Sequence, residues 1–194
     1  MISPEGMSAP PTYAAYRAYL SRATGVVIPV YLPDNGNREK GAALLRDTVV
    51  AACVEISDPS AICLSVDGEE SGVEIAEELA RTYGVTAIAT PVNRGKLQGV
   101  RQGAQVLLKR PELAYLVVID ADSDHFPNEL LTLIRTAAHI AWQTQDPRVS
   151  VLGRRISRHR PMGLLRGELE DLADQLLMEA IRYHAAVSGE PLRF

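Results

Sequence analysis

Residues 115–127, YLVVIDADSDHFP, join an apolar strand to two aspartates and then to a proline. Aspartates are poor strand formers and are costly to bury without partners. Because residues i and i+2 of an extended strand point the same way, Asp120 and Asp122 could present two carboxylates toward one site. A divalent cation is the first candidate to compensate them, since hard oxygen ligands suit Mg²⁺ or Mn²⁺.

On both sides of this stretch, short apolar runs alternate with helical patterns. The pattern predicts strands over 25–31, 61–66, 85–91, 115–119 and 148–152, and helices over 12–23, 42–56, 72–83, 96–109, 128–143 and 164–187. The Pro, Asn and Gly content of 32–41 predicts a loop, and Gly84 is the expected C-cap of the third helix. This alternation predicts an α/β fold with a mostly parallel, doubly wound sheet flanked by helices.

Composition limits the class of protein. The 194 residues suit one domain over 1–194, with an arm at residues 1–11, and 46% of them are hydrophobic. A net charge of −4 does not suggest a nucleic-acid-binding face. Because the sequence contains neither a membrane-spanning run nor a signal-peptide pattern, we expect a cytoplasmic protein. Cys53 and Cys63 are expected to be buried small side chains in a reducing compartment.

Polar residues gather where the predicted strands end, which is where open α/β sheets bind ligands. In chain order they are Pro29 and Tyr31; Asp67 with Gly68, Glu69 and Glu70; residues 93–96, NRGK; Asp120 and Asp122; and Gly153, Arg154 and Arg155. Lys96, at a helix start beside Gly95, could meet a phosphate together with backbone N–H groups. The sequence has no GxxxxGK[ST] loop and no GxGxxG after a strand, so neither a P-loop nor a dinucleotide fingerprint is indicated.

Four segments, GVVIPVY, SVDGEES, NRGKLQGVRQG and VVIDADSDHFP, resemble in order the nucleotide-sugar half of family-2 glycosyltransferases of the GT-A fold. The resemblance covers about residues 25–155. It implies a Rossmann-like fold and the following nucleotide-sugar contacts: Pro29 and Tyr31 at the base and ribose, Asp67 at the base, Asn93 and Lys96 toward the diphosphate, and Asp120 at the ribose. It also implies a Mg²⁺ or Mn²⁺ cofactor on Asp122, with Asp120 as a second candidate ligand.

The resemblance is weaker toward the acceptor. Residues 66–71, VDGEES, stand where the family often has an acidic pair followed by Gly-Ser. Residues 150–155, SVLGRR, are similar to a turn in enzymes that glycosylate phosphate-bearing acceptors, such as polyprenyl-phosphate transferases, which makes Arg154 and Arg155 acceptor-binding candidates. The chain ends at Phe194, where relatives generally continue, so we expect a truncated acceptor region.

Other polar residues have a structural interpretation that competes with a functional one. Glu170 and Asp171 are candidates for a general base, but they lie on an amphipathic helix, and a solvated face is the favoured interpretation. Asp124 and His125 could support a metal site or serve packing. The basic run over 154–160 could bind a phosphate or be a solvated loop. The remaining histidines, His139, His159 and His184, are expected at the surface or in the core.

The sequence thus predicts a metal-dependent glycosyltransferase, a hexosyltransferase by resemblance, that uses a nucleotide-diphosphate sugar and inverts configuration. The acceptor is expected to bear a phosphate and could be a lipid phosphate met at a membrane surface. Two alternatives stay open, a nucleotidyltransferase and a truncated domain that binds nucleotide sugar without turnover. Homo-oligomerisation also stays open.

Overall fold

The computed structural model describes residues 13–34, 37–122, 127–153 and 164–189. The chain divides into two compact units, Met1–Val151 and Leu152–Phe194. The first holds the sheet and most of the helices, and the described part of the second is a single long helix, α6 (Leu164–Ser188). Within the described residues, no helix has the length and apolar character needed to cross a membrane.

A parallel four-stranded sheet forms the centre of the first unit. Its strands are β1 (Thr24–Val30), β2 (Ile62–Asp67), β3 (Thr86–Thr90) and β4 (Tyr115–Val118), in the order β3-β2-β1-β4. The chain moves outward from β1 to β2 and β3 and then returns to the other side of β1 for β4. The switch in strand order therefore lies between β1 and β4, and ligands of open α/β sheets bind at such a point.

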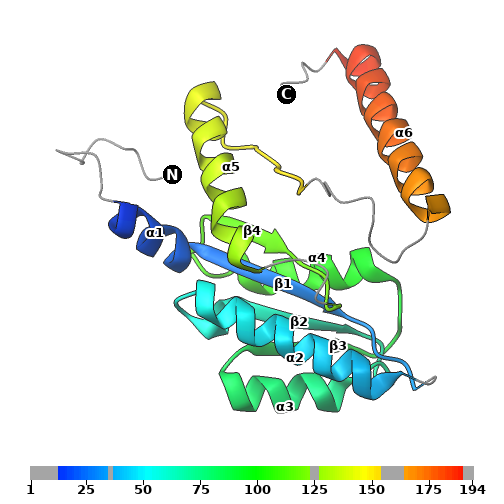
Figure 1. Cartoon of the computed structure of the whole chain (residues 1–194). Helices are drawn as coiled ribbons and strands as arrows, with labels where there is room; N and C mark the ends of the chain where they lie inside the picture. The colour runs from blue at the N-terminus through cyan, green and yellow to red at the C-terminus, as the bar shows by residue number, and fades with distance from the viewer. Residues whose placement is uncertain (1–12, 35–36, 123–126, 154–163, 190–194) are drawn as a thin grey trace. The chain divides into compact units, whose positions relative to one another are not determined.

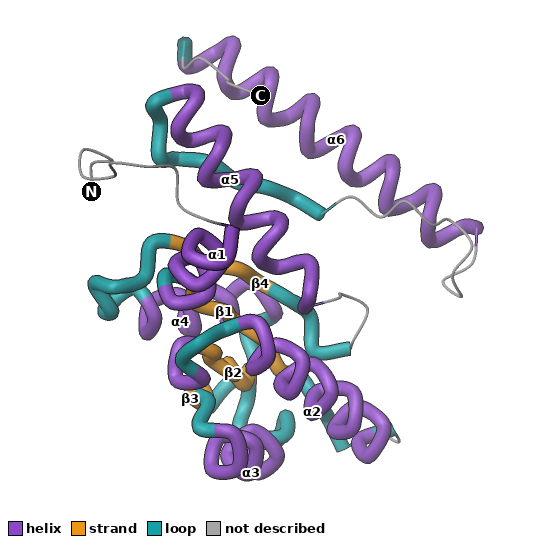
Figure 2. The backbone as a smooth tube through the Cα atoms, turned by 60° about the vertical axis from the view of Figure 1, so that its left-hand side comes forward, coloured by secondary structure: helices purple, strands orange, loops and turns teal. Residues whose placement is uncertain are grey.

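Helices cover both faces of this sheet (Figures 1 and 2). One face carries α1 (Tyr13–Arg22), α2 (Arg38–Glu55), α3 (Val73–Tyr83) and α5 (Leu130–Thr144), and the other carries α4 (Lys96–Leu107). Two short 3₁₀ turns, η1 (Pro59–Ala61) and η2 (Pro127–Glu129), precede β2 and α5. This arrangement confirms the α/β fold with a mostly parallel sheet flanked by helices, consistent with a GT-A fold.

The core forms because the central strands are apolar on both faces. Every residue of β2 is buried, as is every residue of β1 except Pro29, which is half-buried. Continuous apolar runs of this kind are typical of parallel strands covered by helices on both sides. The edge strand β4 differs, since Tyr115 and Val117 face α1 and α5 while Leu116 and Val118 stay exposed.

Two sequence predictions for the elements are wrong. Residues 148–152 form no strand, because their backbone is engaged locally: the Arg148 N–H donates to the Asp146 side chain and the Val149 N–H to the Pro147 carbonyl, both at 3.0 Å. Helix α2 begins at Arg38, inside the predicted loop. Leu32 packs against Gly41 near the start of this helix. A Cβ at residue 41 would lie 2.6 Å from the Leu32 side chain, so this packing requires glycine at that position.

Candidate functional site

Proline ends one ladder of the sheet beside the switch in strand order. Pro29 lies past the last register pair between β1 and β4, Val27 with Val118. Since proline has no N–H, it donates nothing to prolong that ladder. The two strands can therefore part here, with Tyr31, 57% exposed, following β1 and the Asp120 segment following β4.

Asp67 closes β2 and lies beneath the exposed turn at 93–95. Its side chain is only 4% exposed. One carboxylate oxygen accepts the Arg94 N–H at 2.9 Å, and the other accepts the Gly95 N–H at 2.6 Å. The Thr90 hydroxyl adds a longer contact at 3.4 Å. A buried carboxylate is stable when it is hydrogen-bonded, and backbone N–H groups supply those bonds here.

The turn itself depends on glycine. Gly95 has φ +94° and ψ 159°, a region that only glycine adopts without strain. Its N–H also lies 3.0 Å from the Asn93 side-chain oxygen, so Asn93 and Asp67 share the same donor. Lys96 follows directly as the first residue of α4. Asp67 thus fixes the position at which this helix begins.

Lys96 forms an ion pair with Asp120, which joins the start of α4 to the end of β4. The Lys96 side chain is 59% exposed and that of Asp120 is 31% exposed, so both can still be reached by solvent. The sequence placed these two residues at one edge of the sheet, and the structure brings them into contact.

The strand geometry predicted for the two aspartates is wrong. Strand β4 ends at Val118, and residues 121–122 form a turn, so the alternation of an extended strand does not govern Asp120 and Asp122. Asp122 is exposed at the surface of this turn. Within the described ranges, no group of three or more His, Cys, Asp or Glu residues could hold a metal ion by itself. Two carboxylate groups still fit Mg²⁺ or Mn²⁺, because such ions are commonly held by one or two carboxylates, water and substrate phosphates.

Three polar residues of the site carried no functional prediction. Thr90, at the end of β3, contacts the Val66 carbonyl and Asp67, both at 3.4 Å. The buried Ser65 donates to the Gly99 carbonyl at 2.7 Å and so ties β2 to α4. Ser71 accepts the Leu32 N–H at 2.9 Å through its carbonyl, which joins the loops after β1 and β2. A serine inside the apolar strand ICLSVD was the one available signal.

The structure describes the remaining candidate site residues only in part. Glu69 and Glu70 are exposed in the turn before α3. Glu170 and Asp171 lie on α6 in the second unit, and their side chains are outside the described residues. The same is true of Asp124 and His125 and of residues 154–160, which include Arg154, Arg155 and His159. Their predicted roles stay predictions.

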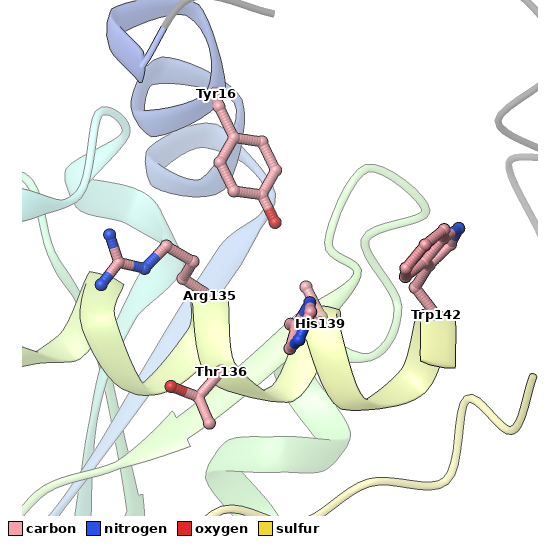
Figure 3. Close-up of a pocket in the computed structure, with 6 residues that line it drawn as sticks. Tyr16, Arg135, Thr136, His139 and Trp142 are labelled. Carbon is pink, nitrogen blue, oxygen red and sulfur yellow. The ribbon is translucent and has the colours of Figure 1, made fainter. Parts of the chain in front are cut away.

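A cavity of the first unit lies elsewhere, between α1 and α5 (Figure 3). It has a volume of about 560 Å³ and is lined by Tyr16, Arg135, Thr136, Ala138, His139 and Trp142. The His139 and Trp142 rings stack with centroids 6.3 Å apart. Helix α1 precedes β1, so this cavity lies toward the amino-terminal side of the strands. Because open α/β sheets bind ligands at the opposite edge, the strand ends are the better candidate site.

Comparison with known proteins identifies the family of the chain. The model of the family described as Glycosyl transferase family 2 matches residues 25–176, most of the chain. No individual curated protein and no solved structure shows significant similarity to this chain. The match gives the nucleotidyltransferase alternative no better support. It covers β2, β3, β4, all of β1 except Thr24, α4 and residues 120–122. The chain therefore belongs to glycosyltransferase family 2.

Proposed function

We propose that the protein is a metal-dependent glycosyltransferase that moves a sugar, a hexose by resemblance, from a nucleotide-diphosphate sugar to an acceptor with inversion of configuration. The family match supports transfer of a glycosyl group. The contact between Lys96 and Asp120 carries the rest of the proposal, because it places a cation and a carboxylate together at the switch in strand order.

The proposed donor contacts follow from the position of each residue at the carboxyl ends of the strands. Pro29 and Tyr31 border the base and ribose, and Asp120 approaches the ribose. Asn93 and Lys96 face the diphosphate, where the N–H groups of the first turn of α4 favour an anion. Asp122, with Asp120 as a second ligand, would hold Mg²⁺ or Mn²⁺ beside the phosphates.

Catalysis then requires charge stabilisation on the leaving group. The bond from the anomeric carbon to the diphosphate oxygen breaks, its electron pair leaves with the diphosphate, and the acceptor oxygen bonds to the opposite face of that carbon. Lys96 binds the diphosphate more strongly as negative charge develops on it. A bound Mg²⁺ or Mn²⁺ would supply further positive charge at the same oxygens.

The acceptor is proposed to bear a phosphate, with a lipid phosphate at a membrane surface as one source. An ionised phosphate oxygen is already a nucleophile and needs no general base, whereas a hydroxyl does. Arg154 and Arg155 are the proposed acceptor contacts, because a guanidinium fork matches phosphate oxygens. Glu170 and Asp171 are the proposed bases only for a hydroxyl acceptor.

Binding and turnover test the proposal separately. Calorimetry with nucleoside diphosphates should show binding that is at least tenfold tighter with Mn²⁺ than with chelator, and Asp122→Ala should remove that difference. Asp47→Asn, which changes an exposed aspartate of α2, is the control and should bind as the wild type does. Equal binding by wild type and Asp122→Ala in the presence of Mn²⁺ would refute the metal assignment.

A panel of nucleotide sugars and acceptors then tests transfer. Release of nucleoside diphosphate together with a glycosylated, phosphate-bearing product is the expected result. Tight donor binding without product, across both phosphorylated and hydroxyl acceptors, would instead support a domain that binds nucleotide sugar without turnover.

A further inference from the structure

The carboxylate of Asp67 is already occupied by the protein itself. It lies beneath the turn at 93–95, and its two oxygens accept the backbone N–H groups of Arg94 and Gly95 at 2.9 and 2.6 Å. The second oxygen also lies 3.1 Å from the Arg94 nitrogen. With 4% of its surface exposed, Asp67 has little area left for a ligand.

The turn that Asp67 holds determines where Lys96 lies. Gly95 is the residue before α4, and the carbonyl of Gly95 accepts the N–H of Gln98 at 2.9 Å to start the helix. Farther along, Ser65 binds the Gly99 carbonyl, so β2 secures α4 at two points one turn apart. Lys96 projects from the segment between these two attachments.

We propose that Asp67 is a positioning residue: it holds the 93–95 turn so that Lys96 and the first N–H groups of α4 meet the donor diphosphate, and it does not itself bind the base. This inference rests on the proposed function for the identity of the ligand. It departs from the role that the family resemblance implies for Asp67, namely contact with the nucleotide base.

Substitution by asparagine tests the contact with little change in size. An asparagine offers one acceptor oxygen and one NH₂ donor, whereas the turn presents two N–H donors. Asp67→Asn therefore places an NH₂ donor against one of these N–H groups, and the turn shifts. We expect inorganic pyrophosphate with Mg²⁺ to bind Asp67→Asn on the order of tenfold more weakly, with unchanged binding of free nucleosides.

A second variant reaches the same turn from its other side. Gly95→Ala introduces no steric contact, since nothing lies within 4 Å of the added Cβ, but it strains a backbone at φ +94°. It should reproduce the selective loss of pyrophosphate binding even if Asp67→Asn folds poorly. Glu55→Gln is the matched control, because Glu55 is a buried carboxylate paired with Arg17 at 2.8 Å, outside this turn.

A double-mutant cycle separates positioning from general loss of structure. In a Lys96→Ala background, Asp67→Asn should weaken pyrophosphate binding by less than about threefold further, because its main effect passes through Lys96. Full additivity of the two changes would overturn the proposal. An equal loss of nucleoside and pyrophosphate binding by Asp67→Asn would also overturn it and would return Asp67 to the base.

Hydrogen exchange tests the same inference without any ligand. The Arg94 and Gly95 amides should exchange several-fold faster in Asp67→Asn than in the wild type or in Glu55→Gln. Unchanged exchange would overturn the positioning role. If wild-type protein binds neither pyrophosphate nor nucleosides, the proposed function fails, while the exchange experiment still decides whether Asp67 holds the turn.

Discussion

At the scale of single residues, Lys96 and a divalent cation are rivals for Asp120. The ion pair places a positive charge at the carboxylate that would also contact the metal. A cation arriving alone must displace Lys96, whereas a cation arriving with a diphosphate gives Lys96 a new anionic partner. Cation and diphosphate should therefore bind cooperatively.

This rivalry predicts opposite effects of one substitution. Lys96→Met should strengthen binding of Mn²⁺ alone about two- to fivefold, because an exposed ion pair contributes up to about 1 kcal/mol. The same change should weaken binding of the Mn²⁺–nucleoside diphosphate complex about tenfold or more. Electron paramagnetic resonance of free Mn²⁺ measures both. Lys109→Met, at an exposed lysine just beyond α4, is the control, and weaker binding of Mn²⁺ alone to Lys96→Met would contradict the rivalry.

Cys63 provides a prediction for alkaline pH. Burial raises the pKa of its thiol from 9.0 to about 11, and the side chain is fully buried against α4. The unfolded chain loses this proton near pH 9 while the native protein keeps it, so stability is full below pH 9 and falls as pH rises toward 11. The loss at pH 10 is about 1.4 kcal/mol. Urea unfolding at pH 8 and pH 10 should show this loss in the wild type and not in Cys63→Val, and an identical loss in both would refute the assignment.

The roles of single residues were only partly readable from the sequence. Asp67 was singled out because it follows a strand, but its partners are backbone N–H groups 27 and 28 residues away. Every residue except proline carries a backbone N–H, so the sequence does not show which N–H groups will bind Asp67. The Lys96–Asp120 contact was easier to foresee, because opposite charges that follow the carboxyl ends of two parallel strands are visible in the sequence.

At the scale of elements, α4 packs on the sheet through two glycines that differ in the space around them. A Cβ at Gly103 would lie 2.6 Å from the Val27 side chain, whereas a Cβ at Gly99 would make ordinary contacts at 3.6 Å and beyond. Helix α4 can therefore lie this close to β1 only because residue 103 has no side chain.

The glycine pair gives a matched test of this packing. Gly103→Ala should destabilise the protein by about 1–3 kcal/mol, because Val27 must move within a packed core. Gly99→Ala should be neutral or stabilise by up to about 1 kcal/mol, since alanine favours the helix and meets no close neighbour. Urea unfolding of the two variants checks the difference, and equal effects would show that the close approach is unimportant.

Arg110 joins the loop before β2 to the loop before β4, at the amino-terminal ends of these strands. Arg110, between α4 and β4, donates to Asp58, to Ser60 at 2.9 Å and to Glu112 at 2.7 Å. Hydrogen bonds from Arg110 and Ser60 lower the pKa of Asp58 below 3.8. The stabilisation is therefore present above about pH 4 and is lost as pH falls through the lowered pKa.

Arg110→Ala should cost about 1 kcal/mol at pH 7, since the groups are partly exposed and screened by salt. The difference from wild type should shrink below pH 3 and in high salt. Urea titrations at pH 7 and pH 2.5 measure it, with Arg101→Ala, at an exposed arginine of α4, as the control. A difference independent of pH would mean that packing rather than charge dominates.

Most elements followed from apolar periodicity, and the exceptions have local causes. Strands β1 to β4 lie where β-branched and apolar runs predicted them, because burial on both faces requires such runs. The predicted strand at 148–152 failed because the Asp146 side chain and the Pro147 carbonyl bind the amides that a ladder would need. Apolar periodicity indicates which side chains suit a strand. It does not indicate whether a neighbouring strand is available to pair with it.

At the scale of the whole molecule, the donor and acceptor candidates fall in different units. The residues proposed to bind the donor all lie in Met1–Val151, while Arg154, Arg155, Glu170 and Asp171 belong to Leu152–Phe194. The family match extends to residue 176 and so includes part of each unit. The sequence predicts one domain over residues 1–194, because apolar periodicity describes single elements and carries no information about a boundary between units.

This division predicts that the kind of acceptor decides which acidic residues matter. Transfer to a phosphate-bearing acceptor needs no proton removal at neutral pH, so Glu170→Gln and Asp171→Asn should change its rate by less than about twofold. Transfer to a plain hydroxyl, if it occurs, should fall about 10²-fold or more in the variant that lacks the general base. Donor binding should stay unchanged in both variants, which separates an effect on chemistry from an effect on folding.

The measurement is steady-state release of nucleoside diphosphate, with matched acceptors that differ only in a phosphate group. Arg154→Ala and Arg155→Ala should raise KM for the phosphorylated acceptor and leave the affinity for donor unchanged, because a guanidinium that binds the acceptor phosphate has no part in donor binding. Efficient transfer to the hydroxyl acceptor that is insensitive to both arginines and lost in Glu170→Gln or Asp171→Asn would reverse the proposal. The acceptor would then be a sugar hydroxyl, and an acidic residue of α6 would act as its base.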